Sequence, residues 1–189
     1  KVQINELKKY IKKPKAKITW HLGGHKKQDF LNADLIVRNP DVPYYSEFLE
    51  IARKNKIPVE NDITLFLKMH GVEETIAVTG TRGKTTTTHL IYRMVAEFDK
   101  YAFMAGNVGV SPLLKPEWSD PLRPAVFELS SFLLHEFGEH KISPHISVIT
   151  NIYPDHQNKY RGMKDYIRDK QNIFLHQKPG DFAIFNADS

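Results

Sequence analysis

Short apolar runs alternate with stretches of helical spacing along the second half of the chain. The runs contain many β-branched and aromatic residues, a composition typical of β-strands. The five predicted strands are Thr75–Thr79, Tyr101–Ala105, Ala125–Leu129, His145–Ile152 and Phe182–Phe185. Because strands and helices alternate, the pattern predicts an α/β fold built on a parallel sheet.

Two of the stretches between these strands have the spacing of amphipathic helices. The first carries apolar residues at intervals that predict one buried helix face. These residues are Leu90, Ile91, Met94, Val95 and Phe98. The second helix is expected at Met163–Phe174, where Ile167 and Ile173 supply apolar side chains.

The first part of the chain carries shorter elements of the same two kinds. The expected elements are strands at Ile18–Leu22, Leu35–Val37 and Ile57–Val59, and helices at Tyr45–Lys54 and Thr64–Met69. The polar turn at residues 70–74 is the best domain boundary. We therefore expect a parallel-sheet, Rossmann-like N-terminal domain at residues 1–71 and an α/β central domain at residues 72–189. The chain lacks an initiator methionine and stops directly after a strand-like run, so we expect both domains to be partial.

Composition excludes several classes of protein. The hydrophobic content of 41% is that of a globular chain, no apolar run approaches the roughly 20 residues of a membrane span, and the first residues are no signal peptide. The absence of cysteine excludes a disulfide framework and suits a cytoplasmic protein. The net charge of +5 comes from residues 1–17, which hold seven lysines and one acid. Because these lysines show neither an interleaving with aromatic residues nor a recognised binding motif, we expect a solvated lysine face and no nucleic-acid partner.

The strand at Thr75–Thr79 leads into a glycine-containing loop and then a helix. Glycines let the backbone turn tightly around a phosphate, and the helix N-terminus favours the anion. A lysine at this position can reach the β- and γ-phosphates of ATP, and the hydroxyl after it can bind Mg²⁺. The loop is shorter than the general P-loop, because Val78 stands where that pattern has glycine. An ordinary strand-to-helix turn is the alternative. The candidate cofactor-binding residues are Gly80, Thr81, Arg82, Gly83, Lys84, Thr85, Thr86 and Thr87.

Polar residues also follow the next three predicted strands. Asn107 lies between two glycines, Glu128 and Ser130 end an apolar strand, and His156 lies in the loop after residue 152. Ligands bind at the carboxyl ends of parallel strands, so these positions predict one site. A buried carboxylate at Glu128 is costly unless a metal or a neighbouring loop pairs with it. Taken singly, His156 is typical of a solvated histidine and Asn107 of a turn residue.

Together these segments resemble the Mur ligases, ATP-dependent amide-bond-forming enzymes of peptidoglycan precursor synthesis. The matching segments, in order and spacing, are Thr79–Thr86, Gly106–Gly109, Glu128–Phe132, Asp155-His156 and Lys170. The resemblance covers roughly residues 18–189. It implies a P-loop mononucleotide-binding central domain.

The first part narrows the resemblance to one branch of the family. Residues 38–43 and 56–66 are similar to the N-terminal domain of the ligases that add D-glutamate to UDP-N-acetylmuramoyl-L-alanine. This similarity implies that residues 1–71 form part of a domain that binds the UDP-linked substrate. The resemblance implies an ADP-forming acid–amino-acid ligase that works through an acyl phosphate, as a cytoplasmic monomer without a membrane or nucleic-acid partner. The family's C-terminal domain contributes to the choice of amino acid. This chain has no such domain, so we expect residues 1–189 alone to be inactive.

The resemblance also implies roles for individual residues. Lys84 holds the β- and γ-phosphates, and Lys84, His156 and Lys170 are the catalytic residues. Thr85 and Glu128 bind one Mg²⁺, while His156 and a carbamylated Lys170 bind a second. Asn107 also belongs to the cofactor-binding set, because it faces the γ-phosphate of ATP. The substrate-contacting residues are Asn107, Ser130 and His156.

Three positions depart from the family pattern. Arg82 stands where asparagine is common, Leu133 where glutamine is usual and Asn158 where aspartate is usual. The phosphate and metal residues are intact, so the departures bear on substrate contacts. Another Mur ligase or a folylpolyglutamate-type ligase would share the central motifs, although neither is expected to carry residues 38–43. A non-catalytic ATP-binding module is the alternative of a different class.

Overall fold

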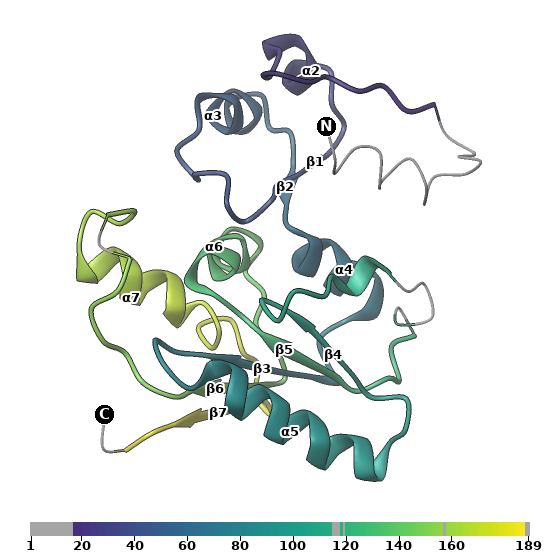
Figure 1. The fold of residues 1–189 in the computed structure, drawn as a ribbon, viewed down its shortest axis with the longest axis vertical. Coiled ribbons are helices and arrows are strands. Elements are labelled where there is room, and N and C mark those ends of the chain that lie inside the picture. The colour runs from purple at the N-terminus through teal and green to yellow at the C-terminus, as the bar shows by residue number, and fades with distance from the viewer. Residues whose placement is uncertain (1–16, 115–117, 119, 157, 188–189) are drawn as a thin grey trace.

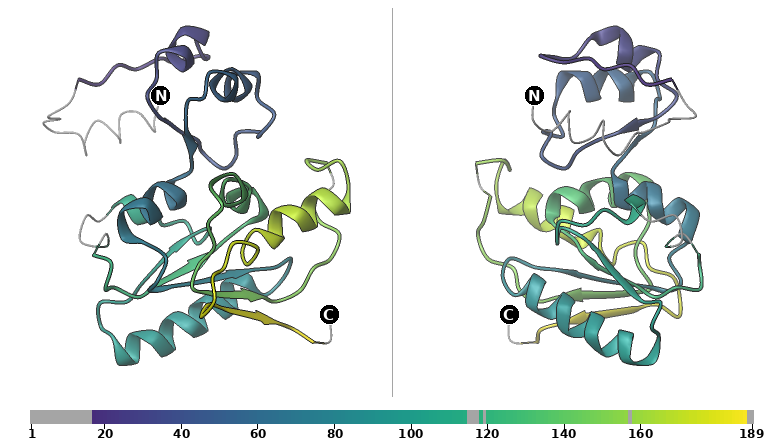
Figure 2. Two further views of the ribbon diagram at one scale, coloured as in Figure 1. Left: turned by 180° about the vertical axis from the view of Figure 1, so that it is seen from behind. Right: turned by 45° about the vertical axis from the view of Figure 1, so that its right-hand side comes forward.

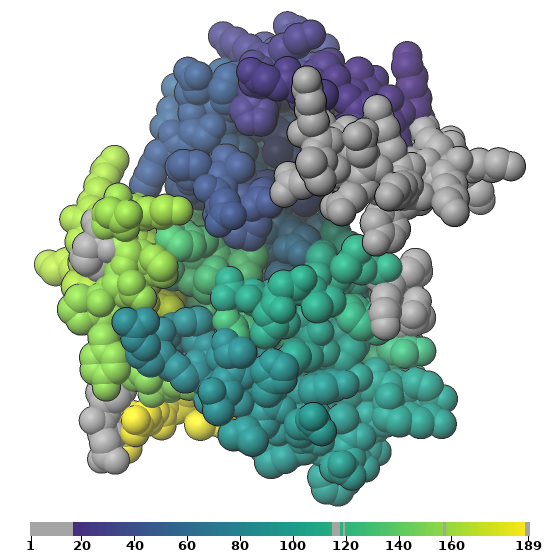
Figure 3. All heavy atoms as spheres, viewed as in Figure 1, coloured from purple at the N-terminus to yellow at the C-terminus, as the bar shows by residue number. Residues whose placement is uncertain are grey.

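The computed structural model describes residues 17–114, 118, 120–156 and 158–187 (Figure 1). Residues 1–16, which hold most of the lysine-rich segment, lie outside the described residues. The chain forms two lobes, which the space-filling view shows one above the other (Figure 3). We call residues 17–60 the N-terminal lobe and residues 61–187 the sheet lobe.

The sheet lobe is built on five parallel strands in the order β4-β5-β3-β6-β7. The strands are β3 (Thr75–Thr79), β4 (Phe103–Gly106), β5 (Ala125–Glu128), β6 (Ile146–Ile149) and β7 (Phe182–Phe185). The α/β fold class and the five predicted strands are confirmed, with β4, β5 and β6 shorter than expected. At β6 the prediction included residues 150–152, whose backbone instead turns toward the loop after β3.

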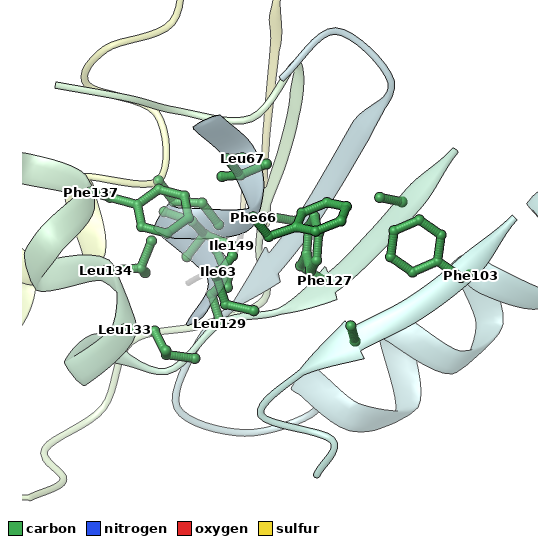
Figure 4. Close-up of a cluster of buried hydrophobic side chains, with 14 residues drawn as sticks. Ile63, Phe66, Leu67, Phe103, Phe127, Leu129, Leu133, Leu134, Phe137 and Ile149 are labelled. Atoms are coloured by element: carbon green, nitrogen blue, oxygen red, sulfur yellow. The ribbon is translucent and has the colours of Figure 1, made fainter. Parts of the chain in front are cut away.

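Helices cover both faces of this sheet (Figures 1 and 2). One face carries α5 (Lys84–Phe98), and the other carries α4 (Asp62–His70), α6 (Ser131–His140), α7 (Met163–Gln171) and the 3-10 turn η1 (Pro112–Leu114). The main core lies between the sheet and the second group, where aromatic and aliphatic side chains interlock (Figure 4). Its labelled members are Ile63, Phe66, Leu67, Phe103, Phe127, Leu129, Leu133, Leu134, Phe137 and Ile149.

Helix α4 precedes the expected boundary at residue 71, yet its side chains pack into this core. The helix begins two residues before the predicted Thr64 because Asn61 caps it. The Asn61 side chain accepts hydrogen bonds from the backbone N–H groups of Ile63 and Thr64, and the Thr64 hydroxyl accepts one from Asn61 N. This reciprocal capping box satisfies otherwise orphaned donors of the first turn.

The prediction of one buried apolar face on α5 is wrong for three of its five residues. Leu90, Met94 and Phe98 are 60%, 58% and 94% exposed. Ile91 and Val95 are half-buried, and the only buried residue in α5 is Thr88. The helix therefore turns the side formed by positions 88, 91 and 95 toward the sheet, which leaves the adjacent apolar side in solvent.

The N-terminal lobe has a small core of its own. Strand β1 (Ile36–Val37) pairs in parallel with β2 (Val59–Glu60), and α2 (Lys27–Leu31) and α3 (Glu47–Lys54) accompany them. Leu49, Ala52 and Val59 form the buried centre. The predicted strand at Ile18–Leu22 is wrong: this segment is exposed and pairs with no strand of the described chain. Among the described residues, no helix is long and apolar enough to cross a membrane.

The packing predicts that Phe127→Ala destabilises the protein strongly. Phe127 is 1% exposed and its ring contacts those of Phe66 and Phe103, so truncation leaves a cavity in the core. We expect the free energy of unfolding in urea to fall by about 3–5 kcal/mol. Leu90→Ala is the control and should change it by less than about 0.5 kcal/mol, because Leu90 lies in solvent. Equal losses in both variants would contradict the observed orientation of α5.

Candidate functional site

The loop between β3 and α5 has the backbone geometry of a phosphate-binding loop. Gly80 has φ 150°, and a Cβ there would lie 2.0 Å from Thr150 Oγ1, so only glycine fits. Gly83 has φ 79° and is the N-cap of α5, whose first turn no side chain caps. The N–H groups of that turn are thus available to an anion.

Lys84 and Arg82 take different positions on this loop. The half-buried Lys84 folds back, and its Nζ donates to Thr81 O at 3.1 Å. The Arg82 side chain is 76% exposed, and its Nη1 lies 3.8 Å from Asp155 Oδ2. The Arg82 backbone exchanges two hydrogen bonds with the Asn151 side chain, at 2.9 and 3.1 Å. The loop is therefore anchored to the segment after β6 by its backbone.

The three threonines after Lys84 lie on the outer side of the helix start. Thr85 and Thr86 are exposed and line a shallow hollow on α5, while Thr87 is half-buried. The Thr85 hydroxyl is therefore open to solvent, where an ion bound to a nucleotide could reach it.

Glu128, at the end of β5, has a carboxylate oxygen that no described residue pairs with. The residue is 2% exposed. Its Oε1 accepts a hydrogen bond of 2.7 Å from Asn107 Nδ2, and its buried Oε2 accepts none from the described residues. A buried lone oxygen is costly, and oxygen donors of this kind suit Mg²⁺. No cluster of three or more His, Cys, Asp or Glu within the described ranges could hold a metal, so the ion would need further oxygen ligands.

A cavity of about 300 Å³ lies beside the loop. The predicted site residues that line it are Gly80, Lys84, Asn107, Ser130, His156 and Lys170. The predicted residues outside its lining are Thr81, Arg82, Gly83, Thr85, Thr86, Thr87 and Glu128. Six of the thirteen predicted site residues therefore surround one space, at the carboxyl edge of the sheet and on α7.

The polar lining residues are held by local backbone features. Asn107 N donates to Glu128 O at 2.9 Å, an approach that Gly106 permits because a Cβ there would lie 2.3 Å from the same oxygen. Ser130 is the N-cap of α6 and accepts a hydrogen bond from the backbone N–H of residue 133. His156 has φ 51°, unusual for a non-glycine residue, and its side chain is 47% exposed.

Lys170 is a buried lysine with an unusually acidic ammonium. It is 2% exposed, and its Nζ donates to Gly80 O at 2.8 Å and to Thr79 Oγ1 at 3.3 Å. Burial, and then the positive charge of Lys84, lower the pKa of Lys170 to about 7. The amine is therefore partly neutral at physiological pH, a form that can act as a nucleophile.

Six further residues line the cavity, and no pattern in the sequence assigned them a role. These are Asp41, Ser131, Phe132, Asp155, Lys159 and Tyr166. Tyr166 lies four residues before Lys170, a spacing that places both on one helix face and could have identified it. Asp41 comes from the N-terminal lobe, and no local pattern predicts its position there.

Two of the departures from the family pattern have clear structural settings. Leu133 is 3% exposed and packs in the main core, so it serves packing there. It also lines a second cavity that contains Asn107. Asn158 is exposed and lies on the wall of a third cavity, away from the phosphate loop.

Comparison with curated proteins finds close relatives. The chain is 42% identical over 172 residues to the UDP-N-acetylmuramoylalanine--D-glutamate ligase of Roseiflexus sp. (strain RS-1), covering 91% of this chain and 37% of that protein. It is 42% identical over 167 residues to the ligase of the same name from Borreliella burgdorferi (strain ZS7), covering 88% and 36%. The chain thus spans little more than a third of the length of these relatives.

Solved structures share the fold. The UDP-N-acetylmuramate-alanine ligase of Thermotoga maritima matches with a TM-score of 0.51 at 25% identity, over 88% of this chain and 38% of that one. A MurF ligase from Thermotoga maritima in complex with ADP matches with a TM-score of 0.50 at 16% identity, over 85% and 47%. The model of the Mur ligase middle domain matches residues 78–189, which include the phosphate loop, Glu128 and Lys170. The chain belongs to the Mur ligase family.

Proposed function

We propose that the protein to which this chain belongs adds D-glutamate to UDP-N-acetylmuramoyl-L-alanine in the cytoplasm, with ATP converted to ADP and phosphate. The names of the relatives at 42% identity support this choice of substrates. The phosphate loop and the cavity beside it support the use of ATP.

One observation carries the proposal: two lysines and a free carboxylate oxygen converge at one edge of the sheet. Lys84 and Lys170 both line the cavity. Glu128 ends the neighbouring strand, and its Oε2 has no hydrogen-bond partner among the described residues. Phosphoryl transfer depends mainly on positioning and on neutralising the charge of the phosphates. This cluster supplies cationic and metal-binding groups where a phosphate would lie.

Each residue has a role in that reaction. Lys84 would hold the β- and γ-phosphates, and Asn107 would orient Glu128 while facing the substrate. The residues that would hold two Mg²⁺ ions are Thr85, Glu128, His156 and Lys170, the last as a carbamate. Bound Mg²⁺ would neutralise phosphate charge during transfer.

The chemistry then follows in two steps. The substrate carboxylate takes the γ-phosphate and releases ADP. The amine of D-glutamate attacks the resulting acyl phosphate, so an amide forms and phosphate leaves. The protein's part in both steps is to hold the groups in line.

Release of ADP by the full-length protein tests the function. With Mg-ATP and UDP-N-acetylmuramoyl-L-alanine, ADP should accumulate beyond one equivalent per enzyme only when D-glutamate is added. L-alanine, L-lysine and meso-diaminopimelate serve as competing amino acids. Turnover with one of these instead would assign another Mur ligase, and nucleotide binding without turnover would favour a non-catalytic module.

Lys84→Ala is expected to weaken the binding of Mg-ATP at least about 100-fold, because it removes charge-assisted hydrogen bonds worth about 1.5–3 kcal/mol each. The helix and strand around it pack without the ammonium, so circular dichroism should not change. Calorimetric titration measures the affinity, with Lys164→Ala, an exposed lysine on α7, as control. Equal affinities of the Lys84 variant and the original protein would contradict the assignment of the phosphate loop.

Lys170 is expected to form a carbamate with CO₂. The reaction needs the neutral amine, and the pKa of about 7 means that this form increases as pH rises from about 6 to about 8. ¹³C NMR with labelled bicarbonate, at fixed dissolved CO₂, should show a carbamate signal that grows over this range. The signal should be absent from Lys170→Arg and present in Lys164→Ala. A signal of the same size in both variants would rule out Lys170 as the modified residue.

A further inference from the structure

A buried ion pair joins the N-terminal lobe to α6 of the sheet lobe. Arg38, directly after β1, donates from Nη2 to Glu136 Oε2 at 2.7 Å and from Nε to Glu136 Oε1 at 2.5 Å. The side chains are 2% and 0% exposed. This two-pronged pairing of a guanidinium with a carboxylate fixes direction as well as distance.

The other donors of Arg38 hold backbone on both sides of the junction. Nη1 donates to Pro40 O at 3.1 Å and to Val42 O at 2.8 Å, and Nη2 donates to Phe132 O at 2.9 Å. One side chain therefore ties the loop at residues 39–43 to the first turn of α6, next to the residues that line the cavity.

Glu136 also binds the residue that follows the second strand of the N-terminal lobe. Asn61, directly after β2, donates from Nδ2 to Glu136 Oε2 at 3.1 Å and to Leu133 O at 3.0 Å. The residues that follow β1 and β2 therefore both donate hydrogen bonds to the Glu136 carboxylate.

The loop held by Arg38 forms a wall of the candidate site. It is folded on itself, since Asp41 N donates to Asn39 Oδ1 at 2.9 Å and Val42 N to Asn39 O at 3.0 Å. Asp41 lines the cavity that contains Lys84 and Lys170, and also the two neighbouring cavities. A shift of the loop would therefore change the shape of the site.

We propose that Arg38 and Glu136 are positioning residues that set the place of the loop at residues 39–43, and of the N-terminal lobe, relative to the phosphate loop. The catalytic consequence rests on the proposed function, in which two substrates react in line and small misplacements are costly. The pair touches neither reacting group. It acts through the backbone that it holds.

Suitable substitutions can separate the positioning role of this ion pair from its effect on the stability of the protein. Removing one partner leaves an unpaired buried charge, whereas replacing both with apolar residues is often neutral for stability. The double variant Arg38→Met/Glu136→Leu should therefore fold while losing the directed hydrogen bonds. Arg38→Lys keeps the charge but not the two-pronged geometry.

A matched control lies one turn further along α6. Arg53 of the N-terminal lobe donates to Glu139 Oε1 at 3.2 Å and to Tyr44 O at 2.9 Å, but both charged side chains are partly exposed. Arg53→Met therefore removes a bridge between the same two lobes without touching the loop at residues 39–43.

The first experiment measures geometry and needs no enzyme activity. The sequence has no cysteine, so Lys54→Cys on α3 and Glu97→Cys on α5, both exposed, can carry spin labels alone. Pulsed electron resonance should give one narrow distance distribution in the original chain and in Arg53→Met. The distribution should broaden or shift in Arg38→Met/Glu136→Leu, whose thermal unfolding remains cooperative. An unchanged distribution in the double variant, or equal broadening in Arg53→Met, would overturn the proposal.

The second experiment measures function in the full-length protein. The double variant should raise KM for the nucleotide-sugar substrate about 10–100-fold, with Mg-ATP affinity within about twofold of the original. The KM of Arg38→Lys should lie between those of the original protein and the double variant, and the KM of Arg53→Met should equal that of the original protein. An unchanged KM in an active double variant would refute the catalytic role. An inactive original protein would refute the proposed function, while the distance measurement would still decide whether the pair positions the lobe.

Discussion

Parallel pairing of β3 with β5 and β6 is the constraint on which the site depends. Val78 pairs with Glu128, and Thr79 pairs with Ile149, so the loop after β3 emerges beside the carboxylate of one neighbour and the polar turn of the other. Because side chains alternate along a strand, a slip of one residue in β5 would turn Glu128 to the opposite face of the sheet. The strand register therefore determines which polar side chains lie together at the carboxyl edge of the sheet.

Two lysines lie close together at this edge of the sheet. Lys84 contributes to the lowered pKa of Lys170, and both amines donate to carbonyl oxygens of the phosphate loop itself, at Thr81 and Gly80. A polyphosphate would replace these weak backbone partners with full negative charges. The loop therefore holds its cations in place by hydrogen bonds to neutral groups, which a stronger anionic partner can displace.

Local patterns predicted the strands and the glycine-containing turn between β3 and α5 because their signals lie in adjacent residues, such as the glycines at 80 and 83. Periodicity also identified α5, but it could not tell which of two adjacent apolar sides faces the sheet, and Leu90 was assigned to the wrong one. The burial of Lys170 could not be derived from a polar helix such as α7. The contact between Arg38 and Glu136 spans 98 positions, and no local signal marks a pair so far apart.

The Asn61 amide serves two structures at once: its oxygen caps α4, and its nitrogen holds Glu136. The connection between the lobes therefore has a structural role of its own. The start of α4 and the contact of the N-terminal lobe with α6 both depend on the Asn61 side chain. In a chimaera that exchanges the N-terminal lobe between two relatives, Arg38, Asn61 and Glu136 must therefore come from the same parent protein. A join between residues 60 and 61 would take Arg38 from one parent and both Asn61 and Glu136 from the other.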